Sequence, residues 1–134
     1  MLAEDLACPT VGENIAFLKR HFGSRVGSLS GLSERIQVLT PGIDGKPAKS
    51  FVFAEGFDRI GDGVAAGFLP LKGKVLFACI PDLWELSNPT EGHAAERKSL
   101  QHGYGVHVGS GAHSLHGLRI GPDGKLYFSV GDRG

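Results

Sequence analysis

The sequence predicts a mainly β protein with a helical segment near its start. Three observations favour this class: short apolar runs of strand length, turn residues between those runs, and 21 glycines among 134 residues. That share of glycine is about twice the ordinary one and suits many tight turns between short strands. Short strands at regular spacing are typical of a sandwich, a barrel or a propeller, and their pattern does not choose among the three.

A helix is predicted from about residue 11 to residue 22. Thr10 stands three residues before Glu13, which is the spacing of a capping box at the start of a helix. Apolar side chains then recur at helical spacing at Ile15, Leu18 and Phe22. Residues 23–33 are rich in serine and glycine and predict a loop. We therefore assign residues 1–34 to a helical insertion and loop that precede the strands.

Short strands are predicted from residue 35 onward, in a second region that covers residues 35–134. Six runs precede a final hairpin: Arg35–Leu39, Ser50–Ala54, Gly63–Leu69, Lys74–Cys79, Trp84–Leu86 and Glu96–Leu100. Glycine and proline turn signals separate these runs, among them Pro41-Gly42 and Lys72-Gly73. Cys79 ends an apolar run, so it is predicted to be a buried free thiol, while a disulfide with Cys8 is the alternative.

The last part of the sequence predicts a β-hairpin whose open end carries polar groups. Apolar residues alternate with other residues on both sides of a turn signal: Leu118 and Ile120 before it, and Leu126, Phe128 and Val130 after it. The turn signal, Gly121-Pro122-Asp123-Gly124, combines the fixed φ of proline with a glycine that tolerates positive φ. Pairing of the two runs brings His113 and His116 near Asp132. A histidine beside a carboxylate, on loops held by a sheet, is a candidate general base with its orienting partner.

Four histidines within fifteen residues raise the question of a metal site: His102, His107, His113 and His116. Zinc requires several convergent ligands with supporting partners, and only His113 and His116 are close in sequence. No cysteine lies near them, and the helical His-Glu-x-x-His pattern is missing. We therefore predict no metal, and we favour polar loop histidines over metal ligands.

Charge and hydropathy exclude two classes of partner. The chain carries 14 basic and 14 acidic residues, so it presents no basic field for nucleic acid. No apolar run reaches the length of a membrane span. The start, Met1–Leu6, is acidic and lacks the basic and then apolar order of a signal peptide, which taken alone indicates a cytosolic protein.

The final hairpin resembles the active-site hairpin of the glucose/sorbosone dehydrogenases, which include the soluble quinoprotein glucose dehydrogenases. Both have a histidine, two further residues and a small residue before a strand, then Gly-Pro-Asp, a second strand and Gly-Asp-x-Gly. The resemblance extends to large dehydrogenase-like proteins of planctomycete and verrucomicrobial type, which join such a propeller to helical repeats and a C-terminal c-type haem module. Its most specific segments are Arg97–Leu100, Gly103–Val108 and His113–Gly134.

The resemblance implies a six-bladed β-propeller with pyrroloquinoline quinone (PQQ) in its central cavity, and this chain would form about the first two blades. His113 matches the general base of the dehydrogenases, and Asp132 matches the carboxylate that holds it. His107 and His116 match histidines to which we assign no role. Relatives often carry acidic loops suited to calcium, but the corresponding loops here hold too few carboxylates for about six to eight oxygen ligands, so no metal is predicted there either.

The implied function is that of a sugar or alcohol dehydrogenase. His113 would remove a hydroxyl proton while hydride passes to PQQ, and an acceptor such as a cytochrome c module would take the electrons. Most quinone-binding basic residues of the relatives come from later blades, so we expect this chain to be an N-terminal fragment, inactive alone, of a periplasmic protein. Any c-type haem would belong to sequence beyond this chain. The alternative is a non-catalytic propeller module that binds carbohydrate or protein.

Overall fold

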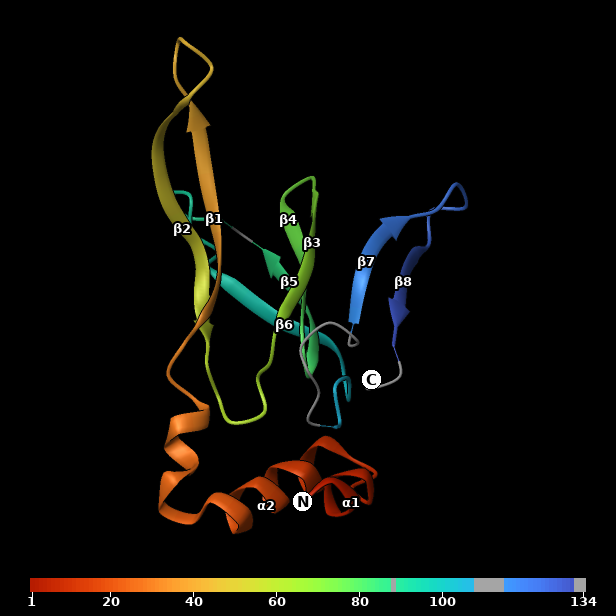
Figure 1. The fold of residues 1–134 in the computed structure, drawn as a ribbon. Helices are drawn as coiled ribbons and strands as arrows, with labels where there is room; N and C mark the ends of the chain where they lie inside the picture. Colours follow the sequence, from red (N-terminus) through yellow and green to blue (C-terminus); the bar gives the residue numbers. More distant parts are fainter. Residues whose placement is uncertain (88, 108–114, 132–134) are drawn as a thin grey trace.

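The computed structural model describes residues 1–134 apart from 88, 108–114 and 132–134 (Figure 1). The described residues form a mainly β structure, which confirms the predicted class. The helices are α1 (Leu2–Leu6), α2 (Val11–Phe22) and the 3-10 helix η1 (Gly23–Leu29). The strands are β1 (Glu34–Pro41), β2 (Pro47–Phe57), β3 (Ala65–Leu71), β4 (Lys74–Cys79), β5 (Asp82–Ser87), β6 (Glu96–His102), β7 (Leu115–Ile120) and β8 (Leu126–Val130).

Helix α2 begins and ends where the sequence predicts. The Thr10 hydroxyl accepts a hydrogen bond from the Glu13 backbone N–H at 3.2 Å, which satisfies one of the unpaired donors at the helix start. Gly23 follows the last helical residue with a φ of +53°, a conformation that glycine adopts without a clash between Cβ and the backbone. The capping residues therefore fix both ends of this helix.

Two helical segments differ from the sequence prediction. The predicted loop at residues 23–33 is wrong over its first part, which forms η1. A 3-10 helix needs only contacts between residues three apart, and the Ser28 hydroxyl donates to the Arg25 carbonyl at 2.7 Å over that spacing. Helix α1 is not predicted, because five residues are too few to show a helical period. Asn14 holds it in place by donating to the buried Asp5 carboxylate at 2.6 Å.

Every strand predicted from the sequence is present, with bounds that shift by a few residues. The strands form three antiparallel sheets: the hairpin β1–β2, the four-stranded sheet β3–β4–β5–β6, and the hairpin β7–β8. Strands of the middle sheet pair in sequence order, so each turns back beside its predecessor without a crossover. Figure 1 shows the middle sheet between the two hairpins.

Alternate residues of β4 belong to two different cores. Phe77 and Cys79 share one core with β1 and β2, whose other buried members are Ile36, Phe53, Ala54, Phe57 and Leu86. Leu76 and Ala78 share the second core with β7, whose other buried members are Leu83, Tyr104, Leu115 and Leu118. Because successive side chains of a strand point to opposite faces, the middle sheet is covered on both faces.

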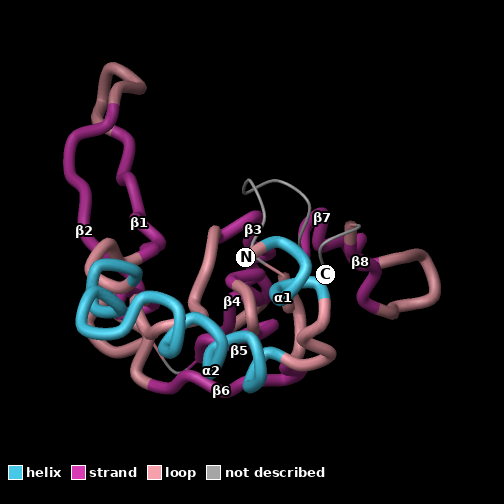
Figure 2. Tube along the Cα trace, turned by 60° about the horizontal axis from the view of Figure 1, so that its bottom comes forward, coloured by secondary structure: helices cyan, strands magenta, loops and turns pink. Residues whose placement is uncertain are grey.

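Helices α1 and α2 lie across one end of the sheets (Figures 1 and 2). They have a small apolar cluster of their own, made by Cys8, Phe17 and Leu18. Ile15 of α2 packs closely over Gly61 in the β2–β3 connection, where a Cβ atom would lie 2.8 Å from the isoleucine Cδ1. His107 Nδ1 lies 3.1 Å from the Asp5 carbonyl oxygen of α1. Among the described residues, no helix is long and apolar enough to cross a membrane.

Candidate functional site

The turn of the β7–β8 hairpin has the predicted position. The Gly124 backbone N–H donates to the Gly121 carbonyl at 2.9 Å, and the Gly121 N–H donates to the Lys125 carbonyl at 2.8 Å. The Asp123 carboxylate accepts from the Lys125 backbone N–H at 3.1 Å, and this bond is the main cause that lowers the pKa of Asp123. The prediction of a turn at residues 121–124 is confirmed, and the turn aligns Ile120 with Leu126 and Arg119 with Tyr127, the pairs next to it.

The two residues predicted to perform chemistry, His113 and Asp132, lie outside the described residues. The register pairs Leu115 with Val130 at the end of the hairpin opposite the turn. The structure therefore fixes the strand residues that stand next to the predicted site in the chain. The contact between His113 and Asp132 stays a prediction.

Two other histidines of the predicted group lie in separate places. His107 contacts the α1 backbone, whereas His102 Nδ1 lies 3.0 Å from the Asp82 carboxylate. Within the part of the chain that the structure describes, no three histidine, cysteine or acidic side chains gather closely enough to hold a metal ion. His102 thus makes a histidine–carboxylate contact that the sequence does not single out.

Asp82 is the centre of a polar group that we call the Asp82 cluster, which comprises Arg59, Asp62, Asp82, Ser99 and His102. The Asp82 carboxylate accepts from the Ser99 hydroxyl at 2.6 Å and from Arg59 Nη2 at 3.2 Å. Arg59 also donates to both oxygens of Asp62, at 2.9 to 3.2 Å. Strand pairing places His102 directly opposite Asp82. The cluster therefore joins the β2–β3 connection to β5 and β6.

The Asp82 cluster has a buried acidic interior and two exposed outer groups. The Asp62 and Asp82 side chains are 4% exposed, while those of Arg59 and His102 are 59% and 57% exposed. The hydrogen bond to Asp62 is the main cause that raises the pKa of Arg59. The Arg59 guanidinium also lies over Trp84, with Cζ 5.5 Å from the ring centroid. Two carboxylates beside one guanidinium leave a formal charge of −1 while His102 is neutral.

Both cysteines are buried free thiols, which confirms the prediction for Cys79 over the disulfide alternative. Burial is the main cause that raises the pKa of Cys79 to about 12. Its Sγ also donates to the Gly63 carbonyl oxygen at 3.5 Å. Because the thiolate is the nucleophilic form, this thiol is inert at neutral pH.

Sequence reasoning misses most of the Asp82 cluster. Ser99 and Arg59 stand 17 and 23 residues from Asp82 in the chain, so no local motif joins them. The sequence does contain one signal of the cluster: Asp82 is a charged residue that follows an apolar strand and precedes an apolar residue, Leu83. A carboxylate in such a position has to find hydrogen-bonding partners. That signal identifies Asp82 as a residue with partners, but it does not identify the partners.

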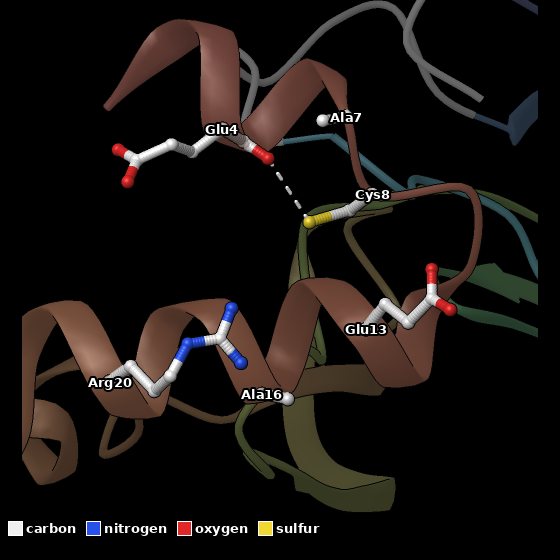
Figure 3. Close-up of a pocket in the computed structure, with 6 residues that line it drawn as sticks. All are labelled: Glu4, Ala7, Cys8, Glu13, Ala16 and Arg20. Carbon is white, nitrogen blue, oxygen red and sulfur yellow. Dashed lines mark hydrogen bonds between the residues drawn. The ribbon is translucent and has the colours of Figure 1, made fainter.

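A shallow pocket of about 370 Å³ lies between α1 and α2 (Figure 3). Its lining consists of Glu4, Ala7, Cys8, Glu13, Ala16 and Arg20. The Cys8 thiol is occupied, since it donates to the Glu4 carbonyl oxygen at 3.3 Å. The charged side chains around the pocket, those of Glu4, Glu13 and Arg20, are exposed. We assign no chemistry to this pocket.

A family match covers most of the chain. Residues 24–134 match the family described as a domain of unknown function, DUF7133. The match begins in η1 and includes all three sheets, while α1 and α2 precede it. No curated protein and no solved structure matches the chain significantly. The chain therefore belongs to the DUF7133 family, a domain of unknown function.

Proposed function

We propose that the chain is part of a β-propeller in which β3–β6 form one complete blade. A propeller blade is a four-stranded antiparallel sheet, and blades pack face to face around a central channel. Two features support this assignment: the strands of the middle sheet pair in sequence order, and both faces of that sheet are covered by other sheets. In this arrangement β1–β2 and β7–β8 belong to the two neighbouring blades.

We further propose that the protein is a dehydrogenase of sugars or alcohols, as the resemblance of its hairpin implies. The observation that carries this proposal is the pairing of Leu115 with Val130. These residues are two positions from His113 and Asp132, one on each strand. His113 removes the proton of the substrate hydroxyl, and Asp132 sets the tautomer and orientation of the imidazole.

Arg59 and Arg97 already bind groups of the chain itself, so we assign neither of them to PQQ, the electron acceptor that the resemblance implies. A quinone with several carboxylates requires cations whose charge is not already neutralised. Arg59 is bound by two buried carboxylates. Arg97 donates to the backbone carbonyls of Glu55 and Gly56 at 2.5 and 3.3 Å. We therefore assign no step of the reaction to the quinone.

The test uses the protein at its natural length, incubated with PQQ and calcium and assayed by dye reduction with aldoses and primary alcohols. We expect PQQ-dependent turnover that falls about 100-fold or more in His113→Ala, because a general base contributes about 10² to 10⁴ in rate. The matched control is His21→Ala, which removes an exposed histidine from α2. Turnover that survives in His113→Ala contradicts the assigned base.

A non-catalytic propeller module that binds carbohydrate or protein is the second candidate. The bonding of two arginines favours this candidate over the dehydrogenase. Arg59 binds carboxylates of the chain and Arg97 binds its backbone carbonyls, so neither is assigned to the quinone. The same experiment separates the two candidates. A cooperatively folded protein that neither binds PQQ nor turns over any substrate selects the binding module.

A further inference from the structure

The Asp82 cluster holds two exposed side chains on one buried carboxylate. Arg59 Nη2 contacts Asp82 Oδ2 at 3.2 Å, and His102 Nδ1 contacts Asp82 Oδ1 at 3.0 Å. Both outer groups are therefore anchored by the same carboxylate, one on each of its oxygens. Their anchor is rigid, since the Asp82 side chain is 4% exposed and also accepts from Ser99 at 2.6 Å. Groups fixed in this way lose little freedom when a ligand binds.

The contact with Asp82 determines which ring nitrogen of His102 faces outward as an acceptor. A carboxylate beside a guanidinium accepts hydrogen bonds, so His102 Nδ1 carries the proton in the neutral ring. Nε2 then has a free lone pair, on a side chain that is 57% exposed. This atom accepts a hydrogen bond from a ligand hydroxyl.

Arg59 supplies the complementary donors. Its Nε and Nη2 atoms bind Asp62 and Asp82. Among the described residues, Nη1 makes no hydrogen bond, and the side chain is 59% exposed. Its packing over Trp84 restricts the guanidinium to one orientation. The cluster therefore presents one donor and one acceptor, both anchored on the Asp82 carboxylate.

The charge of the cluster selects among ligands. The formal charge of −1, from two carboxylates and one guanidinium, disfavours anions. The described residues offer no group of three metal-ligating side chains, so a cation lacks a coordination shell. A neutral molecule with several hydroxyls can bind both outer groups, because one hydroxyl donates to His102 and another accepts from Arg59.

We propose that the Asp82 cluster is a binding site for a neutral polyhydroxylated ligand of the carbohydrate class. One hydroxyl donates to His102 Nε2, and another oxygen accepts from Arg59 Nη1. The site requires neither His113 nor a quinone, so it holds or fails independently of the dehydrogenase proposal.

The test is a titration of the ¹⁵N-labelled protein, followed by NMR, with D-glucose, maltotriose and sorbitol, and with inorganic phosphate for comparison. We expect saturable shifts at Arg59, Ser99 and His102 with at least one of the three polyols. Histidine ¹⁵N shifts should show the Nδ1–H tautomer for His102. If maltotriose gives the strongest response, the source of the ligand is a polysaccharide. If glucose gives a response equal to that of maltotriose, the source is a free sugar.

The decisive variant is His102→Asn, because the asparagine amide can still donate to Asp82 from the Nδ1 position but has no counterpart of Nε2. We expect at least tenfold weaker polyol binding with an unchanged thermal midpoint. Arg59→Lys should weaken binding similarly, since it keeps the charge and loses the Nη1 donors. His21→Asn on α2 is the matched control and should bind as the wild type does.

Three outcomes overturn the proposal. The first is the absence of saturable shifts with every polyol of the panel. The second is equal binding by wild type and by a folded His102→Asn variant. The third is tighter binding of phosphate than of the polyols, which would show that the charge argument is wrong.

Discussion

Asp82 is almost fully buried, and its carboxylate has three side-chain contacts from two other segments of the chain. A buried charge is stable only when its hydrogen-bonding capacity is filled, and removing part of such a network leaves the remaining groups unsatisfied. At the scale of single residues, this carboxylate therefore links the β2–β3 connection to β6.

Replacing Asp82 by asparagine should destabilise the protein by about 2 to 3 kcal/mol, because it removes the charge that Arg59, Ser99 and His102 share while the volume stays nearly constant. Urea unfolding followed by fluorescence measures the difference. Asp44→Asn is the matched control, since Asp44 lies in an exposed turn 3.9 Å from Lys46. Its effect should be below about 1 kcal/mol. Equal effects of the two changes would show that Asp82 is not a structural centre.

At the scale of elements, the β7–β8 hairpin depends on the chemistry of its turn. Its two strands follow one another in the chain and are joined by the 121–124 turn. Gly124 has a φ of +77°, in the left-handed region that disfavours residues with a Cβ atom. This position therefore aligns the strand residues next to the turn, while an irregularity between His116 and Arg119 shifts the pairing before it reaches Leu115 and Val130.

Gly124→Ala should lower the free energy of unfolding by about 1 kcal/mol, although the added methyl group meets no neighbouring atom. The cost arises from the backbone alone. Gly27→Ala is the control. A Cβ atom at Gly27 in η1 would also meet no neighbouring atom, but the φ of Gly27 is not positive. That change should leave stability unchanged or raise it by about 0.5 kcal/mol. Chemical denaturation of the two variants in parallel checks the difference, and a neutral Gly124→Ala would argue against this turn geometry.

For the whole molecule, the defining feature is a middle sheet packed on both faces. Ala78 is 0% exposed and belongs to the core shared with β7. Ala78→Leu should destabilise by about 1 to 3 kcal/mol, because added methylenes have no room in a closed core. Phe68→Leu on β3 is the control, since Phe68 is 58% exposed and its change should cost no more than about 0.5 kcal/mol. If thermal denaturation shows that Ala78→Leu is tolerated, the β7–β8 hairpin does not cover this face.

Much of the fold is predictable from the sequence because its signals are local. The capping box at Thr10, the apolar run at Lys74–Cys79 and the turn at residues 121–124 each identify an element unaided. Helix α1 is too short for such a signal, and η1 has the composition of a loop. The order of sheets and the partners of Asp82 depend on contacts between distant segments, which no local pattern records. The predicted contact of His113 with Asp132 lies outside the described residues and stays a prediction.

Strand β4 is apolar on both faces, so a shift of its pairing by one residue would exchange the two faces without exposing an apolar side chain. In a strand with one polar face, that exposure is what excludes a shifted pairing. The short connections at residues 72–73 and 80–81 and the polar contacts at the two ends of the β4–β5 pair distinguish the alternatives here. Lys74 Nζ lies 2.6 Å from Glu85 Oε2 at one end, and the Asp82 cluster lies at the other. The connections and these few polar residues together select one of two similarly apolar registers, while the apolar residues supply the cohesion of the sheet.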